Sequence, residues 1–143
     1  MVRVIWIAGL LGFSLMFPSC GGPAQGADSP DRAENRAAVE AVDAWLAALD
    51  AGNYEESWRQ SATVFRIGNG TSTNWASAAS EMRGPLGRVV RRQLKEVQRT
   101  NLQEGAAYAL AYDTTFEARR SSTEEVTVVL DGGFWKVAGY LVK

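Results

Sequence analysis

The sequence has no histidine and only one cysteine among its 143 residues. Histidine is the commonest general base and the commonest metal ligand, so its absence removes the serine–histidine type of nucleophile and the usual catalytic metal sites. One cysteine cannot form an intrachain disulfide. We therefore expect no metal site and no cofactor, and a binding protein is favoured over an enzyme.

No strong excess of charge of either sign is present, since the net charge is -1. Nucleic-acid binding usually needs a basic surface, so we expect no nucleic-acid partner. Basic residues gather once, at Arg88, Arg91, Arg92, Lys95 and Arg99. We interpret them as the solvated face of an edge strand, paired across strands with exposed Glu117, Glu124 and Glu125. An anionic surface such as phospholipid head groups is the alternative partner.

Long hydrophobic runs are also absent, apart from residues 4–17 after Arg3. That run is shorter than the roughly 20 apolar residues that span a bilayer. A basic start, an apolar middle and small residues afterwards are typical of a secretory signal. We predict that residues 1–19 are a signal peptide and that the protein is exported.

The end of this signal can be read in two ways. Residues 17–20 (FPSC) resemble a lipobox, which would lipidate Cys20 and anchor a lipoprotein that faces the periplasm or the cell exterior. Cleavage after Gly26 or Ala27 would instead leave a soluble periplasmic protein. We favour lipidation, because an unpaired exported thiol is open to oxidation. Residues 20–30 are rich in Gly and Pro and indicate a flexible tether.

Residues 31–143 predict a single domain that begins with helices. Ser29 followed by proline is a typical start for a helix from about Pro30 to Ala51. Asn53 and Glu56 indicate a variant capping box that opens a second, short helix. A third helix is expected from Ser72 or Thr73 to just before the Gly84-Pro85 pair.

After residue 88 the apolar pattern changes to a period of two, which is typical of strands. Strands are expected at about 88–100, within 107–118 (AYALAYDTTFEA), around the alternating Val126, Val128 and Leu130, and over 134–142. Residues 131–133 (DGG) signal a hairpin between the last two. The predicted fold class is α+β, with N-terminal helices packed on a curved antiparallel sheet of three to four strands, cone-like in shape.

Three stretches resemble the bacterial family called domain of unknown function 4019: residues 44–62 (AWLAALDAGNYEESWRQSA), 82–87 (MRGPLG) and 124–143 (EEVTVVLDGGFWKVAGYLVK). The similarity covers nearly all of residues 37–143. That family is similar in layout to the nuclear transport factor 2-like, or cystatin-like, superfamily. The resemblance implies a cone of helices on a curved sheet and an exported bacterial setting, and it implies no activity.

Some members of that superfamily hold a pocket with an acidic base and tyrosine hydroxyls. The acids near such a sheet here are Asp113, Glu117 and Glu124, with three tyrosines as possible hydroxyl donors, and tryptophans could line a binding cleft. Our candidate ligand-binding residues are Tyr108, Tyr112, Asp113, Tyr140, Trp58 and Trp75. However, strand alternation places Asp113 on the face opposite Tyr108 and Tyr112, so one inward constellation cannot hold all three. We interpret these residues as solvated acids and core aromatics, and we name no catalytic residue.

The sequence therefore favours a lipid-anchored, non-enzymatic envelope binding or interaction module, whose partner is an envelope protein or a small ligand. The alternative is a small-molecule pocket with acid/base catalysis. A carboxylate that points into a deep cavity would favour the alternative. An interior filled by tryptophans with Leu110, Val128 and Val137 would argue against it. The oligomeric state stays open.

Overall fold

The computed structural model describes residues 29–103 and 105–143. The predicted signal peptide, Cys20 and all but the last two residues of the predicted tether lie outside the described residues, so those predictions stay untested. None of the described helices has the length and apolar character needed to cross a bilayer.

The first helix, α1 (Pro30–Asp50), agrees with its predicted bounds to within one residue. Its apolar stripe is buried at five positions: Ala38, Val42, Trp45, Leu46 and Leu49. The start at Ser29 is confirmed, but its side chain forms no cap. Instead, the Ser29 carbonyl accepts hydrogen bonds from the N–H groups of Arg32 and Ala33.

The second helix, α2 (Tyr54–Gln60), begins where predicted, but the capping box is wrong. Asn53 makes no side-chain cap bond. Glu56 accepts hydrogen bonds from Arg59 and Gln60 instead. Side chains three and four residues apart face each other on a helix, and this pairing draws Glu56 away from the helix start.

A short helix that the sequence did not predict, α3 (Thr63–Asn69), follows at once. Seven residues are too few for an independently stable helix. Long-range contacts hold it: the Ala62 N–H donates to the Val137 carbonyl at 2.8 Å. Asp131 Oδ2 accepts from the backbone N–H of Thr63 at 2.6 Å and from its hydroxyl at 3.0 Å. The helix therefore depends on the last hairpin of the chain.

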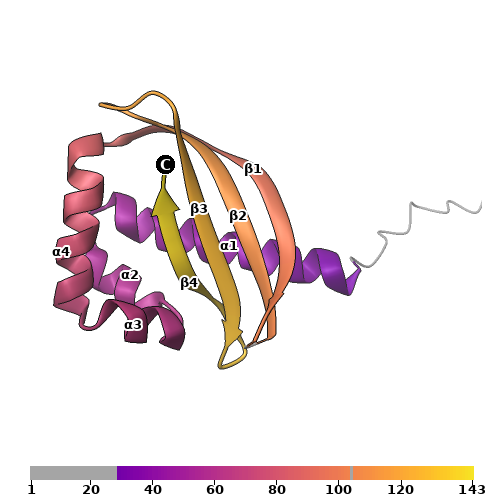
Figure 1. The fold of residues 1–143 in the computed structure, drawn as a ribbon. Helices are drawn as coiled ribbons and strands as arrows, with labels where there is room; N and C mark the ends of the chain where they lie inside the picture. The colour runs from indigo at the N-terminus through magenta and orange to yellow at the C-terminus, as the bar shows by residue number, and fades with distance from the viewer. Residues whose placement is uncertain (1–28, 104) are drawn as a thin grey trace, which may run out of the picture.

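The third predicted helix is confirmed as α4 (Ser72–Arg83), which leads through a single 3₁₀ turn (Gly84–Leu86) to the sheet. The sheet is an antiparallel meander of four strands in sequence order: β1 (Val89–Leu102), β2 (Gly105–Phe116), β3 (Ser122–Asp131) and β4 (Phe134–Val142). The α+β class is thus confirmed. In Figure 1 the sheet is curved, α1 crosses one face, and α2, α3 and α4 lie on the side of β4.

The space between the helices and the sheet is filled by side chains. Leu110, Val128 and Val137 of the inward sheet face are at most 1% exposed. The ring of Trp45 lies among three other aromatic rings at centroid distances of 5.2–6.0 Å: those of Phe65, Trp75 and Tyr140. This filled interior meets the condition that argues against a catalytic pocket.

Candidate functional site

Glu124 of β3 is a carboxylate with no exposed surface. Its Oε1 accepts hydrogen bonds from Arg83 Nη1 at 2.7 Å, Tyr140 Oη at 2.6 Å and Arg92 Nη2 at 3.1 Å. Its Oε2 accepts from Arg92 Nε and Thr114 Oγ1, both at 2.6 Å. A carboxylate has about four lone-pair sites, so these five contacts leave no acceptor free for the proton of a substrate.

Asp50, the last residue of α1, is the second carboxylate of this site. It accepts hydrogen bonds from Arg83 Nη2 at 2.5 Å and from Arg92 Nη1 at 2.6 Å. Both guanidinium groups therefore bridge Asp50 and Glu124, and we call these four residues the charge cluster. Burial by itself would raise the pKa of Asp50, but the hydrogen bonds and positive charges of Arg92 and Arg83 outweigh it and lower the pKa.

The charge cluster joins most of the fold. Its members come from α1, α4, β1 and β3, while Thr114 and Tyr140 add contacts from β2 and β4. Burial and the negative charge of Glu124 raise the pKa of Tyr140, so its phenol stays a hydrogen-bond donor at neutral pH. The Arg83 guanidinium also stacks over the Phe116 ring at 4.9 Å. This arrangement fixes charges and positions, which suits a structural clamp better than an acid/base pair.

The structure corrects two predictions about these residues. Arg92 was expected on a solvated face and Glu124 in an exposed pair, but their side chains are only 16% and 0% exposed. Arg92 pairs in register with Thr114, whose side chain points inward. Because neighbours in a strand point to opposite faces, Arg92 turns inward while Arg91 stays outside. The basic stretch therefore does not form one surface.

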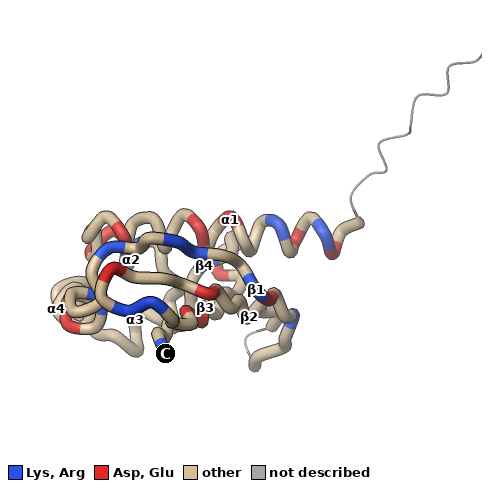
Figure 2. The backbone as a smooth tube through the Cα atoms, turned by 90° about the horizontal axis from the view of Figure 1, so that it is seen from above, with Lys and Arg blue, Asp and Glu red and all other residues tan. Residues whose placement is uncertain are grey.

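The other basic residues of the stretch, Arg88, Arg91, Lys95 and Arg99, do lie at the surface. Acidic side chains pair with all of them except Arg91, which donates to Gln93. The ion pairs are Arg88–Glu117 at 2.7 Å, Lys95–Asp113 at 3.3 Å and Arg99–Asp31 at 3.3 Å, and Arg99 also pairs with Glu34 at 3.5 Å. Figure 2 shows residues of both signs along α1 and along the strands. These pairs leave β1 without a surface of one sign that would attract a polyanion.

Two of the candidate tyrosines, Tyr108 and Tyr112, point inward from β2 and are 3% exposed. Each hydroxyl donates to a different carboxylate of α1: Tyr112 to Asp43 Oδ1 at 3.0 Å and Tyr108 to Glu34 Oε2 at 3.4 Å. Burial raises the pKa of both phenols. Neither hydroxyl is joined by a hydrogen bond to the charge cluster that holds Tyr140, so the three candidate tyrosines form separate contacts.

The candidate tryptophans belong to the packing of the helices. Trp75 Nε1 donates to Ser57 Oγ at 2.9 Å. Trp45 Nε1 donates to the Ser57 carbonyl at 2.8 Å and to Ser61 Oγ at 2.9 Å. Trp58 is half-buried, and its Nε1 has no hydrogen-bond partner within the described part of the chain. Ser57 and Ser61 thus accept hydrogen bonds from buried indole N–H groups, which is a structural role and not that of a catalytic nucleophile.

Asp113 lies on the outer sheet face, as strand alternation predicts, and is 58% exposed. It borders an open, polar hollow of about 450 Å³, lined in part by Arg91, Lys95, Thr115 and Arg120. Within this hollow, Asp113 pairs with Lys95 and Arg91 donates to Gln93. The acidic candidate is therefore separated from all the aromatic candidates by the sheet.

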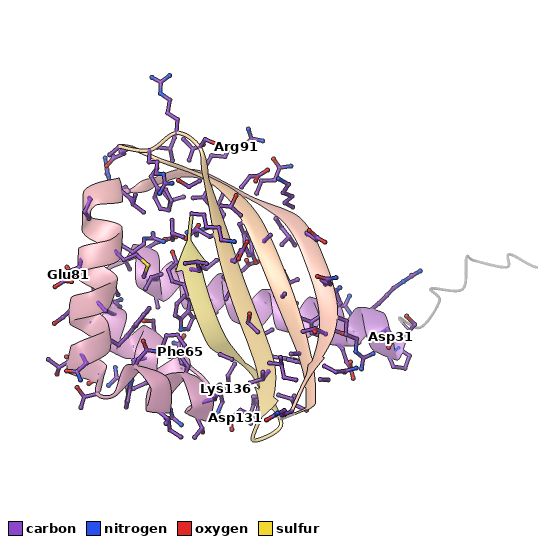
Figure 3. The ribbon with its side chains drawn as sticks, in the orientation of Figure 1. Asp31, Phe65, Glu81, Arg91, Asp131 and Lys136 are labelled. Atoms are coloured by element: carbon purple, nitrogen blue, oxygen red, sulfur yellow. The ribbon has the colours of Figure 1, made fainter. Side chains whose placement is uncertain are left out.

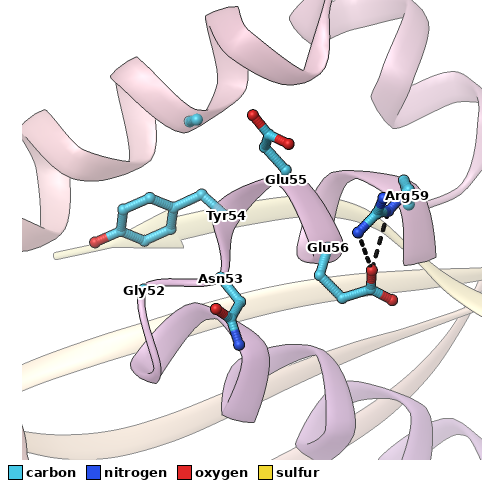
Figure 4. A pocket seen from close by; sticks show the side chains of 7 residues that line it. Gly52, Asn53, Tyr54, Glu55, Glu56 and Arg59 are labelled. Atoms are coloured by element: carbon cyan, nitrogen blue, oxygen red, sulfur yellow. Dashed lines mark hydrogen bonds and ion pairs between the residues drawn. The ribbon is translucent and has the colours of Figure 1, made fainter.

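A second hollow, of about 610 Å³, lies at the turn between α1 and α2 and is open to solvent (Figure 4). Glu55, Glu56 and Arg59 contribute its charges. Hydrogen bonds from Gln60 and Arg59 lower the pKa of Glu56, so this carboxylate stays ionised and paired. Among residues 29–103 and 105–143, no group of three or more metal-ligating side chains occurs.

A third hollow, of about 370 Å³, is a groove between α3 and the end of β3. Its lining is mainly apolar: Ala62, Thr63, Val64, Ile67, Val129, Leu130, Asp131 and Gly132. Asp131 and Thr63, which are joined by hydrogen bonds, are the polar residues of this lining. Apolar surface left open to water in this way is typical of an interaction site.

Sequence reasoning missed Asp50 and Arg83, two members of the charge cluster. A signal for Arg83 was present, because it follows Trp75 and Ala79 at intervals of four and so lies on the buried stripe of α4. A signal for Asp50 was a carboxylate at a helix C-terminus, where the helix dipole disfavours negative charge. At each position the sequence thus indicated a charge that needs a partner of opposite charge from another element.

Comparison with known proteins adds a family and a fold. The model of a family described as "Protein of unknown function (DUF4019)" matches residues 41–140. No curated protein matches the chain. A solved structure from Catenulispora Acidiphila aligns with a TM-score of 0.54 and 15% sequence identity, covering 79% of this chain and 92% of that chain. At this identity the likeness shows the fold alone.

Proposed function

The chain belongs to the DUF4019 family of proteins of unknown function, and because that description names no activity, we propose a function from the site and the N-terminal sequence. We propose that the protein is an exported, lipid-anchored, non-enzymatic binding module of the bacterial cell envelope. The observation that supports the binding role is the filled interior, in which Glu124, the one fully buried carboxylate among residues 29–103 and 105–143, has all its acceptor sites occupied.

The proposed location at the membrane rests on the sequence of the N-terminus. A basic residue, a 14-residue apolar run and the FPSC stretch at residues 17–20 are the parts of a lipoprotein signal. A Gly- and Pro-rich stretch then separates Cys20 from the first helix. This order supports a folded domain held near a membrane by a short tether.

Acid/base catalysis is the competing function, and the closeness of Tyr140 to Glu124 is the observation in its favour. Such chemistry needs a carboxylate with a free lone pair and space for a substrate. Glu124 is instead held by Arg83 and Arg92, and the ring of Trp45 packs against Tyr140 at 5.2 Å. These contacts support binding at the outer surface over chemistry in the interior.

Replacement of Cys20 tests the proposed export and lipid anchor. In the native host, we expect the Cys20→Ser protein to lose lipid labelling and to move from the membrane fraction to the soluble periplasmic fraction. Ser19→Ala is the matched control, because it keeps a small residue before the cysteine and should leave lipidation intact. Unchanged fractionation of Cys20→Ser would refute the anchor, and retention of the wild type in the cytoplasm would refute export.

A further inference from the structure

Five of the eight large hydrophobic side chains that are exposed among the described residues gather at one end of the molecule: Val64, Ile67, Leu102, Leu130 and Phe134. The antiparallel meander places the β1–β2 and β3–β4 turns at the same end, together with α3 (Figure 1). Leu102 lies at the first turn, and Leu130 and Phe134 lie at the second. We call these five residues the apolar end.

The exposure at this end is large. Ile67 is 77% exposed and Phe134 is 71% exposed. Helix α3 is apolar on two sides, because Phe65 packs inward against Trp45 while Val64 and Ile67 face outward. Only one of those sides is needed for the core. An outward apolar side on a helix fixed to a hairpin turn indicates an interaction surface.

The polar groups around the apolar end favour contact with an apolar phase. The Asp131 carboxylate is already occupied by Thr63 and lies 3.9 Å from Lys136 Nζ. Because the Asp131 carboxylate already has these partners, contact with an apolar surface would not desolvate an unpaired negative charge there. Two basic residues lie near the apolar side chains in sequence, Arg66 immediately before Ile67 and Lys136 two residues after Phe134, which suits an anionic head-group layer.

The length of chain before the domain supplies the second argument. Cys20 precedes Ser29 by nine residues (29 minus 20), a stretch that can extend to about 30 Å. Helix α1, with 21 residues, is itself about 30 Å long. A lipid at Cys20 would thus hold the domain within about its own length of the bilayer. At such a high local concentration, a weak apolar contact is sufficient.

We propose that the apolar end rests on the lipid bilayer and inserts Ile67 and Phe134 at the boundary between head groups and acyl chains. This inference rests on the proposed lipid anchor. The side chains of the apolar end project from two turns and one short helix. A fluid lipid surface accommodates such separate projections, whereas a protein partner needs a continuous complementary surface.

A single fluorescent label tests the proposal in the full, lipidated protein. Because Cys20 is the only cysteine, lipidation leaves an introduced cysteine as the sole free thiol. Ile67→Cys and Phe134→Cys carry an environment-sensitive dye at the apolar end. Arg91→Cys is the matched control, because Arg91 lies at the opposite end of the sheet from Asp131 and Lys136 (Figure 3). The proteins are reconstituted into phosphatidylethanolamine–phosphatidylglycerol vesicles with nitroxide-labelled lipids.

We expect a blue-shifted emission and strong nitroxide quenching at positions 67 and 134, and neither at position 91. Equal, weak quenching at all three positions would overturn the proposal. A blue shift without quenching would also overturn it, because a second copy or another protein would then cover the apolar end. Mass analysis of Cys20 separates these results from failure of the anchor.

If Cys20 carries no lipid, the same labels are placed in the Cys20→Ser protein and vesicles are added. Quenching at positions 67 and 134 would then support membrane contact without an anchor, and its absence would refute the contact. In that background, Phe134→Ser should weaken vesicle binding about tenfold, as expected for losing one large apolar side chain. Equal binding by Phe134→Ser and the parent would also refute insertion at this position.

Discussion

Substitution of Glu124 by glutamine tests the charge cluster directly. Glutamine keeps the size of the side chain but removes its negative charge. It also places an amide NH₂ group where Arg92, Thr114 or another donor now points at an oxygen. The change leaves Arg83 and Arg92 with Asp50 as their only nearby carboxylate in the cluster. We expect a large loss of stability with little change of shape.

The magnitude follows from the burial of the pair. Removing one partner of a buried ion pair costs about 3–5 kcal/mol, because it leaves a buried charge without compensation. Here two guanidinium charges would share the single carboxylate of Asp50. The partner charges here are side chains that are 5% and 16% exposed, on Arg83 and Arg92. A domain of this size has a free energy of unfolding of about 5–15 kcal/mol. The single substitution is therefore expected to remove a large fraction of it.

Urea unfolding followed by tryptophan fluorescence measures this loss. With a slope of about 2 kcal/mol per molar urea, the midpoint should fall by about 2 M. Glu125→Gln is the matched control, since it is the same substitution at the next residue of β3. Its carboxylate is 45% exposed and pairs with Lys143 at the surface, so it should cost under about 1 kcal/mol.

An equal, small effect of the two substitutions would refute the idea that the charge cluster holds the fold together. A double variant adds a second check. Glu124→Gln combined with Arg92→Gln restores the charge balance. The cost of the double variant should fall short of the sum of the single costs by about 0.5–3 kcal/mol, as for groups in one network. Strict additivity would show that the two side chains act independently.

Three further predictions concern the neighbours of the cluster. The pKa of Asp50 lies below its unfolded value of 3.8, so its ion pairs contribute their full stabilisation above pH 3.8. This stabilisation is lost as the pH falls through the folded-state pKa. When the stability is followed during acid titration, the Asp50→Asn protein should lack this loss. The pKa of Tyr140 lies above its unfolded value of 10.0, so stability is full below that pH and falls as the pH rises; urea midpoints between about pH 9 and 11 should decline less in Tyr140→Phe, and an identical decline would contradict the assignment. Asp131→Ala should remove the hydrogen bonds from Thr63 to the Asp131 carboxylate, and hydrogen exchange should then be faster at the α3 amides around Thr63. Unchanged protection would show that α3 does not depend on Asp131.

Much of the fold could be predicted because local patterns carried it. The apolar stripe of α1, the period-two alternation of β2 and the DGG turn before Phe134 each reflect interactions between residues close in sequence. These elements appear where expected, to within one or two residues for α1 and β1. The order of helices before a meander also followed from the pattern alone.

What sequence reasoning missed depends on contacts between distant residues. Helix α3 requires Asp131, which lies 68 residues after Thr63. The charge cluster joins Arg83 to Glu124 across 41 residues and Arg92 to Asp50 across 42. Buried charges of this kind resemble solvated ones in a sequence, because only the partner, contributed by another element, allows the burial.

The charge cluster and the aromatic core together direct function away from the interior. A free lone pair on Glu124 would require a broken contact with Arg83 or Arg92, and a charge left buried in this way costs about 3–5 kcal/mol. Space for a ligand would require displacement of rings such as Trp45, whose indole is itself hydrogen-bonded to Ser57. Binding at the apolar end would break no such internal contact, since Ile67 and Phe134 lie mostly in water. Covering them would release ordered water and disturb no internal contact, which supports the proposed membrane contact at this end.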